Sequence, residues 1–123
     1  MIKAVREVII SAIVMLILDG CYLYLNQKTF SDLITNVQRV ILQFRPLGAI
    51  VCYILLIGGL NYFIISRNRS IPEAFLFGLV IYGVYESTNY ATLKKWTPGV
   101  AIMDTVWGGI LMSLTTYLTY TLA

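Results

Sequence analysis

Three carboxylic acid side chains lie well inside apolar stretches of this 123-residue chain: Asp19, Glu86 and Asp104. Lipid cannot solvate a charged side chain, so acidic residues at membrane depth are rare and usually mark a functional site. Carboxyl groups in such places bind a proton or a cation, hold a small polar solute, or take part in acid–base chemistry. The acids therefore predict a polar pocket within the membrane, and the sequence leaves its ligand open.

The three acids are predicted to reach the same depth in the membrane. Each stands six or seven residues from one end of its predicted helix, which is Leu25 for Asp19, Leu93 for Glu86 and Pro98 for Asp104. With a helical rise of about 1.5 Å per residue, each carboxyl group lies roughly 10 Å from one membrane face. We therefore expect the three carboxyl groups to share one layer of the protein.

Polar and aromatic residues recur at helical spacing around the acids. Residues three or four positions from an acid fall on its helix face, and they are Tyr22 beside Asp19, Tyr82 and Asn89 beside Glu86, and Trp107 beside Asp104. We predict that these four side chains donate hydrogen bonds to the carboxyl groups. The predicted ligand- or proton-binding site therefore has seven residues. No catalytic residue is assigned, no cofactor is expected, and a metal ligand is left open.

Three ionised carboxylates in one layer would repel one another, so their charge must be offset. The sequence offers a proton on at least one carboxyl group, a bound cation, or ion pairs with rim residues, namely Arg45, Lys94 or Lys95. We expect the three groups to titrate as a unit and to hold at least one proton near neutral pH.

The composition is typical of a membrane protein. Apolar residues make up 59% of the chain and charged residues 12%, and the mean hydropathy is +0.79. The net charge of +3 falls in short turns without a basic face, so no nucleic-acid partner is expected. The chain has no histidine, which excludes imidazole metal ligands and serine–histidine triads. Cys21 and Cys52 are expected to be small buried apolar residues.

Helical periodicity and helix-end signals predict one all-α membrane domain, residues 1–123, with four transmembrane helices. The predicted spans are residues 4–25, 47–65, 71–93 and 98–120. Ser70 to Glu73 has the form of a capping box, and Thr97-Pro98 is typical of a helix start. The first apolar run continues past Cys21 without a small-residue cleavage site, so we interpret it as a span and not as a signal peptide.

Residues 30–44 are predicted to form an amphipathic helix between the first two spans. The apolar side chains that recur with a helical period include Phe30, Leu33, Val37, Ile41 and Phe44. The segment is too short and too polar to cross a membrane. We expect it to lie in the membrane interface with these side chains facing the bilayer or the bundle. A solvent-side helix packed on the bundle is the alternative.

Four spans would place both termini on one side of the membrane. The terminal side then carries four basic residues, Lys3, Arg6, Arg67 and Arg69, and the other side carries five, Lys28, Arg39, Arg45, Lys94 and Lys95. This near balance does not decide the orientation under the positive-inside rule. We expect an integral, multi-pass protein in contact with membrane lipids, in a membrane that the sequence does not specify.

The chain resembles an uncharacterised family of small bacterial membrane proteins, a domain of unknown function with relatives in large DNA viruses. The stretch FGLVIYGVYESTNYATLKKWTP (residues 77–98) is similar to the family pattern FGLVAYGTYDLTNLATLRGWP. MDTVWGG (103–109) is similar to VDLAWGT, and LDGCYL (18–23) to LDxxWL. The resemblance implies four spans and no particular activity. Glu86 stands where the family has Asp, and Tyr22 where it has Trp.

Three kinds of function fit these observations. The leading hypothesis is a small multi-pass membrane protein whose carboxylate-lined pocket binds or moves a proton, a cation or a small polar solute. Four short helices seldom enclose a path alone, so transport would need a homo-oligomer. The alternative is a structural or assembly protein of a cellular or viral membrane, in which the acids hold the bundle together. An enzyme acting on a lipid is the third reading, and no nucleophile or phosphate-binding motif supports it.

Overall fold

The computed structural model describes residues 2–38 and 46–123, and these residues form helices and turns without a strand. The elements in chain order are α1 (Ile2–Leu25), α2 (Gln27–Gln38), α3 (Pro46–Leu60), the π-helical turn η1 (Asn61–Ile65), α4 (Ile71–Thr92) and α5 (Pro98–Leu122). The turn η1 continues α3 directly, so residues 46–65 form one long element. The helix expected over residues 30–44 begins earlier, at Gln27, and its part beyond residue 38 lies outside the described residues.

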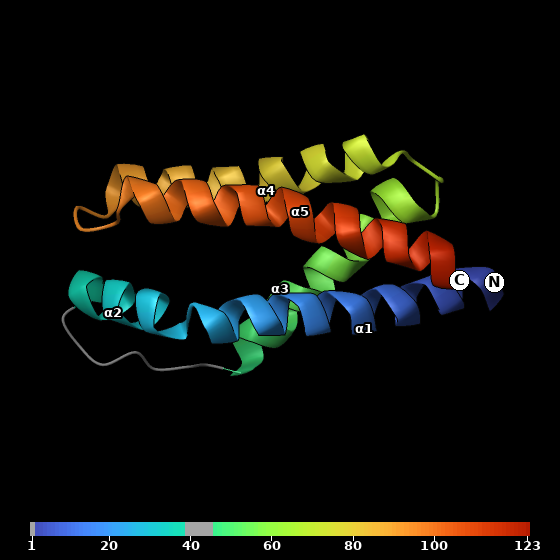
Figure 1. Cartoon of the computed structure of the whole chain (residues 1–123), viewed down its shortest axis with the longest axis horizontal. Helices are drawn as coiled ribbons and strands as arrows, with labels where there is room; N and C mark the ends of the chain where they lie inside the picture. The colour runs from blue at the N-terminus through green and yellow to red at the C-terminus, as the bar shows by residue number, and fades with distance from the viewer. Residues whose placement is uncertain (1, 39–45) are drawn as a thin grey trace.

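The long helices lie side by side and alternate in direction (Figure 1). Helices α4 and α5 form the most closely packed pair, α1 packs against α5, and α3 packs against α1. Both chain ends lie at one end of the bundle, and the α4–α5 turn and α2 lie at the other end (Figure 1).

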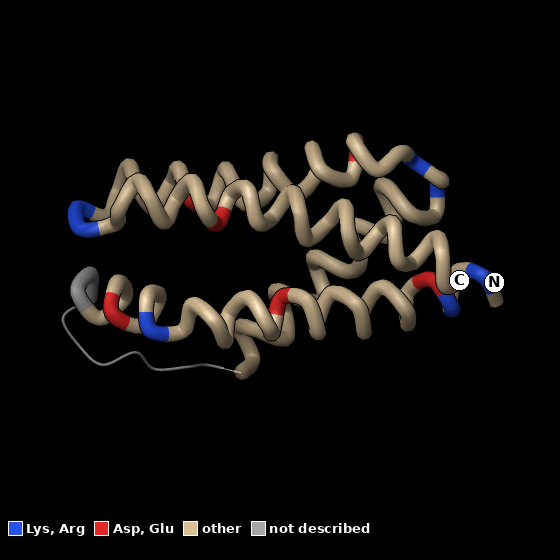
Figure 2. Tube along the Cα trace, in the orientation of Figure 1, with Lys and Arg blue, Asp and Glu red and all other residues tan. Residues whose placement is uncertain are grey.

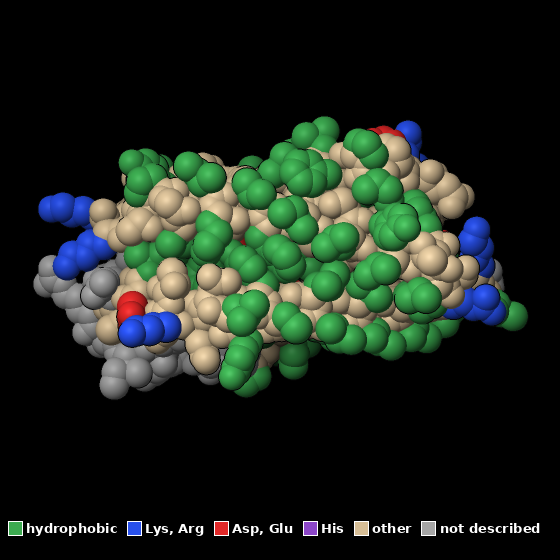
Figure 3. Space-filling model, in the orientation of Figure 1, with side chains coloured by type: hydrophobic (Ala, Val, Ile, Leu, Met, Phe, Trp, Pro, Cys, Tyr) green, Lys and Arg blue, Asp and Glu red, His purple; other side chains and the backbone are tan. Residues whose placement is uncertain are grey.

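Large apolar side chains cover the outside of the long helices, as one face shows in Figure 3. Examples from four helices are Ile17, Leu55, Val84 and Ile102, which are 61%, 68%, 62% and 67% exposed. Water does not favour so large an apolar surface, and lipid does. Basic residues instead gather at the two ends of the bundle, whereas acidic residues lie both at these ends and between them (Figure 2).

Three elements are long and apolar enough to cross a membrane: Ile2–Leu25, Pro46–Ile65 and Pro98–Leu122. The sequence predicted a fourth span at residues 71–93. Helix α4 occupies this region and has 22 residues, but the polar run from Glu86 to Asn89 lowers its hydropathy. The described residues therefore contain three candidate spans and one long, more polar helix.

The starts of α4 and α5 have the caps that the sequence predicts. The Glu73 backbone N–H donates to Ser70 Oγ at 3.3 Å, and the Ser70 backbone N–H donates to Glu73 Oε1 at 3.1 Å, which completes a capping box. The Val100 N–H donates to Thr97 Oγ1 at 3.3 Å. These caps fix the residues at which α4 and α5 begin.

Glycines allow α4 and α5 to approach closely. A Cβ atom on Gly78 would overlap the carbonyl group of Gly108 and lie 2.8 Å from Met112 Cγ. A Cβ atom on Gly108 would overlap the ring of Tyr82. Small residues are favoured at such contacts because helices in lipid associate by close packing rather than by burying apolar surface from water. The contact sets the spacing of the two helices that carry the later acids.

An apolar layer fills the middle of the bundle. Met15, Leu60, Leu111 and Met112 are fully buried in it and come from α1, α3 and α5. Met15 lies one helical turn from the buried Ser11 on one side and one turn from the buried Asp19 on the other. The layer therefore separates two sets of buried polar side chains.

The cysteines and α2 are placed differently from the sequence expectations. Cys21 and Cys52 are exposed rather than buried, because they point away from the helix faces that enter the bundle. In α2, Leu33 is 7% exposed, and the ring of Phe30 lies 6.0 Å from that of Tyr22, so both side chains face the bundle. Three further predicted apolar side chains lie outside the described part: Val37, Ile41 and Phe44.

The close α4–α5 contact predicts a glycine-specific loss of stability. Gly78→Ala should lower the free energy of unfolding in detergent by about 1–3 kcal/mol, because the added methyl group meets backbone that cannot turn away. Gly58→Ala is the matched control, since nothing lies within 4 Å of a Cβ atom there. The measurement is unfolding by sodium dodecyl sulfate, followed by circular dichroism. Equal stability of the two variants would contradict the contact.

Candidate intramembrane carboxylate site

The three predicted acids are all buried, although each lies on a different helix. Asp19 of α1 is 6% exposed, Glu86 of α4 is 1% exposed, and Asp104 of α5 is 8% exposed. A buried carboxyl group costs free energy unless hydrogen-bond donors surround it. The donors that reach each acid therefore define what the site is built to hold.

Asp19 joins three helices. The Tyr53 hydroxyl of α3 donates to Asp19 Oδ2, and the Trp107 indole N–H of α5 donates to Asp19 Oδ1 at 2.9 Å. Each carboxyl oxygen therefore has a donor from another helix. These bonds tie α1 to α3 and α5 at the level of the acids.

Tyr22 connects the surroundings of Asp19 to Asp104. Its ring stacks on that of Trp107, with the ring centroids 4.5 Å apart and the planes 4° from parallel. Its hydroxyl donates to Asp104 Oδ1 at 3.1 Å. Tyr22 and Trp107 thus donate to acids, as the sequence predicts, but each donates to an acid on another helix and not to its own helix neighbour.

Glu86 is held by a residue just beyond the end of its own helix. The Trp96 indole N–H donates to Glu86 Oε1 at 2.8 Å. The Trp96 backbone N–H donates to Leu93 O at 3.0 Å, and this turn folds the indole back toward the acid. The sequence predicted the helix ends on either side of Trp96 but not the hydrogen bond that Trp96 donates to Glu86. Trp96 is only 6% exposed, so it is an internal donor.

The second Glu86 oxygen, Oε2, is buried, and none of the described residues donates a hydrogen bond to it. The Asp104 carboxyl group of α5 is a neighbour of Glu86. Two ionised carboxylates have no hydrogen to share, whereas a carboxylic acid donates to a carboxylate. A proton on one of these two neighbouring acids would supply the donor that Glu86 Oε2 lacks.

Two predicted site residues do not reach a carboxyl group. In the described part of the chain, the hydrogen bonds to the acids come from other side chains, and neither Tyr82 nor Asn89 supplies one. The Tyr82 ring packs against Gly108 at the α4–α5 contact. The backbone carbonyl of Asn89 accepts from the Leu93 N–H at 2.8 Å.

The acids of the site have no basic partner among the described residues. The one ion pair found there joins Arg69 to Glu73 across 3.6 Å, at the start of α4. Lys94 and Lys95 are exposed and pair with no acid, and Arg45 lies outside the described residues. Within the same residues, no group of three acidic or cysteine side chains is spaced to hold a metal ion.

Two hydrogen-bond donors of the site, Tyr53 and Trp96, are not among the residues predicted from the sequence. Tyr53 precedes Leu56 and Leu60 by three and seven residues and shares their buried helix face. The sequence does not show which face of this apolar helix is buried, so spacing alone did not identify Tyr53. Trp96 lies in the α4–α5 turn, where helical periodicity gives no direction. Aromatic residues next to lysines are also typical of an ordinary membrane interface.

A second set of buried polar side chains lies toward the chain ends. Asn61 Nδ2 donates to Ser11 Oγ at 2.9 Å and to Ile57 O at 2.8 Å, which joins η1 to α1. Other buried polar residues at this end of the bundle are Glu7, Thr115, Thr116 and Thr119. Glu7, Ser11, Met15 and Asp19 follow one another at four-residue steps, so one face of α1 carries both polar sets.

A helical bundle with an apolar exterior, three candidate spans and buried acids belongs to the class of integral membrane proteins. Residues 4–121 match the family described as "Predicted membrane protein (DUF2177)", and the chain belongs to that family. The function of this family is unknown, so membership supports the membrane location and gives no activity. No curated protein and no solved structure matches the chain.

The bonds to Asp19 predict that Tyr53 stabilises the bundle. Tyr53→Phe should lower the free energy of unfolding by about 1–3 kcal/mol, because Asp19 Oδ2 loses its donor while staying buried. Tyr62→Phe is the control, since Tyr62 is 59% exposed. Unfolding in detergent measures both, and a double-mutant cycle with Asp19→Asn should show non-additive effects. Additive effects would mean that the Tyr53 hydroxyl does not act through Asp19.

Proposed function

We propose that this protein is a four-span membrane protein that binds and releases a proton at the Glu86–Asp104 pair, as a step in moving a proton, a cation or a small polar solute. The observation that carries the proposal is the buried Glu86 Oε2, which lacks a donor in the described residues and stands beside the Asp104 carboxyl group. A proton shared by the two acids supplies the missing donor. It also removes one of two neighbouring negative charges.

The proposal assigns different roles to the acids. Both oxygens of Asp19 already accept hydrogen bonds, from Tyr53 and Trp107, and these donors stabilise the ionised form. Asp19 is therefore proposed as the structural junction of the bundle. This role corresponds to the alternative hypothesis, in which acids serve helix packing, but here it applies to one acid of the three.

The fourth span is proposed to be α4. A helix of 22 residues extends about 33 Å, which is enough to cross the hydrocarbon core. Its close contact with α5 along the bundle supports the same membrane depth for both helices (Figure 1). Glu86, its one acid deep in the helix, is shielded from lipid at 1% exposure.

We propose that lipids surround the apolar exterior. We also propose that α2 covers the end of the bundle that holds the α4–α5 turn, at the membrane interface. Its orientation relative to the membrane plane stays a prediction. If the protein moves a solute, we propose that several copies of the chain form a homo-oligomer that encloses the path. No nucleic-acid partner is proposed.

The four-span proposal predicts that both termini lie on one side of the membrane. In a variant with Cys21 and Cys52 replaced by alanine, single cysteines at positions 2 and 123 should react with an impermeant maleimide from the same side of oriented vesicles. A cysteine at Lys95 should react from the opposite side. Labelling of positions 2 and 123 from opposite sides would show that one proposed span does not cross.

The proton-binding proposal predicts a carboxylic acid within the membrane at neutral pH. Infrared spectra of the wild-type protein should show a protonated carboxyl C=O band that disappears as the pH is raised. The Glu86→Gln/Asp104→Asn double variant should lose the band, because it removes the pair. Asp19→Asn should keep it.

A band that survives in the double variant and disappears in Asp19→Asn would assign the proton to Asp19 and overturn the proposal. Absence of the band from the wild-type protein would show that the pair holds no proton. Gel filtration and circular dichroism establish that each variant is folded before its spectrum is compared.

A further inference from the structure

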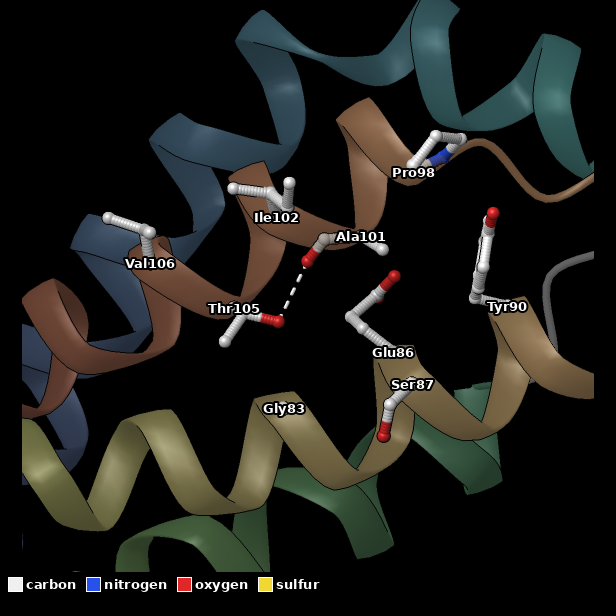
Figure 4. Close-up of a pocket in the computed structure, with 9 residues that line it drawn as sticks. All are labelled: Gly83, Glu86, Ser87, Tyr90, Pro98, Ala101, Ile102, Thr105 and Val106. Atoms are coloured by element: carbon white, nitrogen blue, oxygen red, sulfur yellow. Dashed lines mark hydrogen bonds between the residues drawn. The ribbon is translucent and has the colours of Figure 1, made fainter.

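A groove of about 370 Å³ runs between α4 and α5 with Glu86 among its lining residues (Figure 4). Its volume lies in the range of small-ligand sites. Ile102 and Val106 on its rim are 67% and 43% exposed, so the groove opens on the apolar exterior of the bundle. A ligand would therefore enter from the lipid phase, and it must itself be lipophilic.

The groove offers a ligand very few polar groups. The Thr105 hydroxyl donates to Ala101 O at 2.7 Å, as Figure 4 shows, and the Ser87 hydroxyl donates to Val84 O at 3.2 Å. Both hydroxyl hydrogens are thus used within their own helices. The Glu86 carboxyl group is the one acidic group in the lining, and no lysine or arginine lines the groove in the described part of the chain.

The state of Glu86 points to the charge of the ligand. Figure 4 shows its side chain extending from α4 toward α5, into the space between Ala101 and Tyr90. Glu86 is 1% exposed, Trp96 holds one of its oxygens, and the other oxygen has no donor among the described residues. An ionised carboxylate in apolar surroundings attracts a cation. The Tyr90 ring in the same lining adds a face that favours positive charge.

We infer that the α4–α5 groove binds a lipophilic monovalent cation, with the cationic centre next to the Glu86 carboxylate. The inference rests on the proposed function, because Glu86 must lose its shared proton before it can hold a cation. The apolar walls accept the organic groups of the ligand, and its positive charge takes the place of the released proton. The Asp104 carboxylate keeps its hydrogen bond from the Tyr22 hydroxyl. A divalent metal ion would instead need several oxygen ligands, which this lining does not provide.

Proton and cation then exclude each other at one carboxyl group. When the cation leaves, a proton bridges Glu86 and Asp104, and when the cation enters, that proton is released. Binding should therefore weaken as the pH falls, even though the ligand carries the same charge at every pH.

Tetraphenylphosphonium is a suitable probe, and equilibrium dialysis against the purified full-length protein in detergent measures its binding. We expect saturable binding with one site per chain, weaker at low pH. Glu86→Gln should raise the Kd about tenfold or more, because it removes the charge. Glu73→Gln is the matched control, since Glu73 lies outside the groove at the exposed start of α4, and it should bind as the wild type does.

A second variant separates the groove from the carboxyl group. Ala101→Phe fills the groove and leaves Glu86 and Asp104 in place, so it should abolish tetraphenylphosphonium binding while keeping the infrared C=O band. Neutral triphenylphosphine oxide should bind much more weakly than the phosphonium ion.

Equal binding by the wild type and Glu86→Gln, pH-independent binding, or equal binding of the neutral compound would overturn the inference. A wild-type protein with the C=O band but no saturable binding would overturn it and leave the proton pair intact. Absence of the band would instead overturn the proton pair on which it rests.

Discussion

The need of each buried carboxyl oxygen for a hydrogen-bond donor governs how this bundle is assembled. In lipid no water satisfies such an oxygen, so the protein must bring a donor to it from elsewhere in the fold. Asp19 receives donors from α3 and α5, and Asp104 receives one from α1. Because these donors come from other helices, the acids fix which helices meet and at what height. Glu86 departs from this pattern, since Trp96, its one donor in the part of the chain that the structure describes, belongs to the turn that follows its own helix.

The different position of the Glu86 donor follows from how closely α4 and α5 pack. The contact at Gly78 and Gly108 fills the space between these helices with backbone and the Tyr82 ring. Glu86 lies beyond that contact, where the two helices leave a groove between them. The α4–α5 hairpin therefore forms a tight contact at Gly78 and Gly108 and a groove next to Glu86. It also brings Glu86 beside Asp104, and the inferred ligand would bind in the groove.

The sequence predicts the burial of the three acids well and their hydrogen-bond donors only in part. The burial of Asp19, Glu86 and Asp104 follows from helical period and distance from helix ends, which are local properties that a sequence displays directly. Which donor reaches which acid depends on the rotation and register of neighbouring helices, and the sequence holds no local record of these. Tyr82 shows the consequence, because its spacing matches that of a donor to Glu86 and yet its ring is used at the glycine contact. Trp96 shows the converse, since a turn residue without periodicity became a donor.

The two sets of buried polar side chains lie toward opposite ends of the bundle, and this constrains the proposed transport cycle. Glu86 and Asp104 lie six or seven residues from the α4–α5 turn, which corresponds to roughly 10 Å along a helix. In the proposed cycle, protons entering at this end of the bundle would have a short way to travel. Toward the chain ends, a buried apolar layer that includes Met15 and Met112 stands between the pair and the next polar side chains. A proton does not cross such a layer without water or a polar relay, so in the proposed cycle this layer would block protons on their way toward the chain ends. Release on the other side would require the layer to part. Methionine suits this position, because its unbranched side chain can adopt another rotamer more readily than the β-branched residues that make rigid seals.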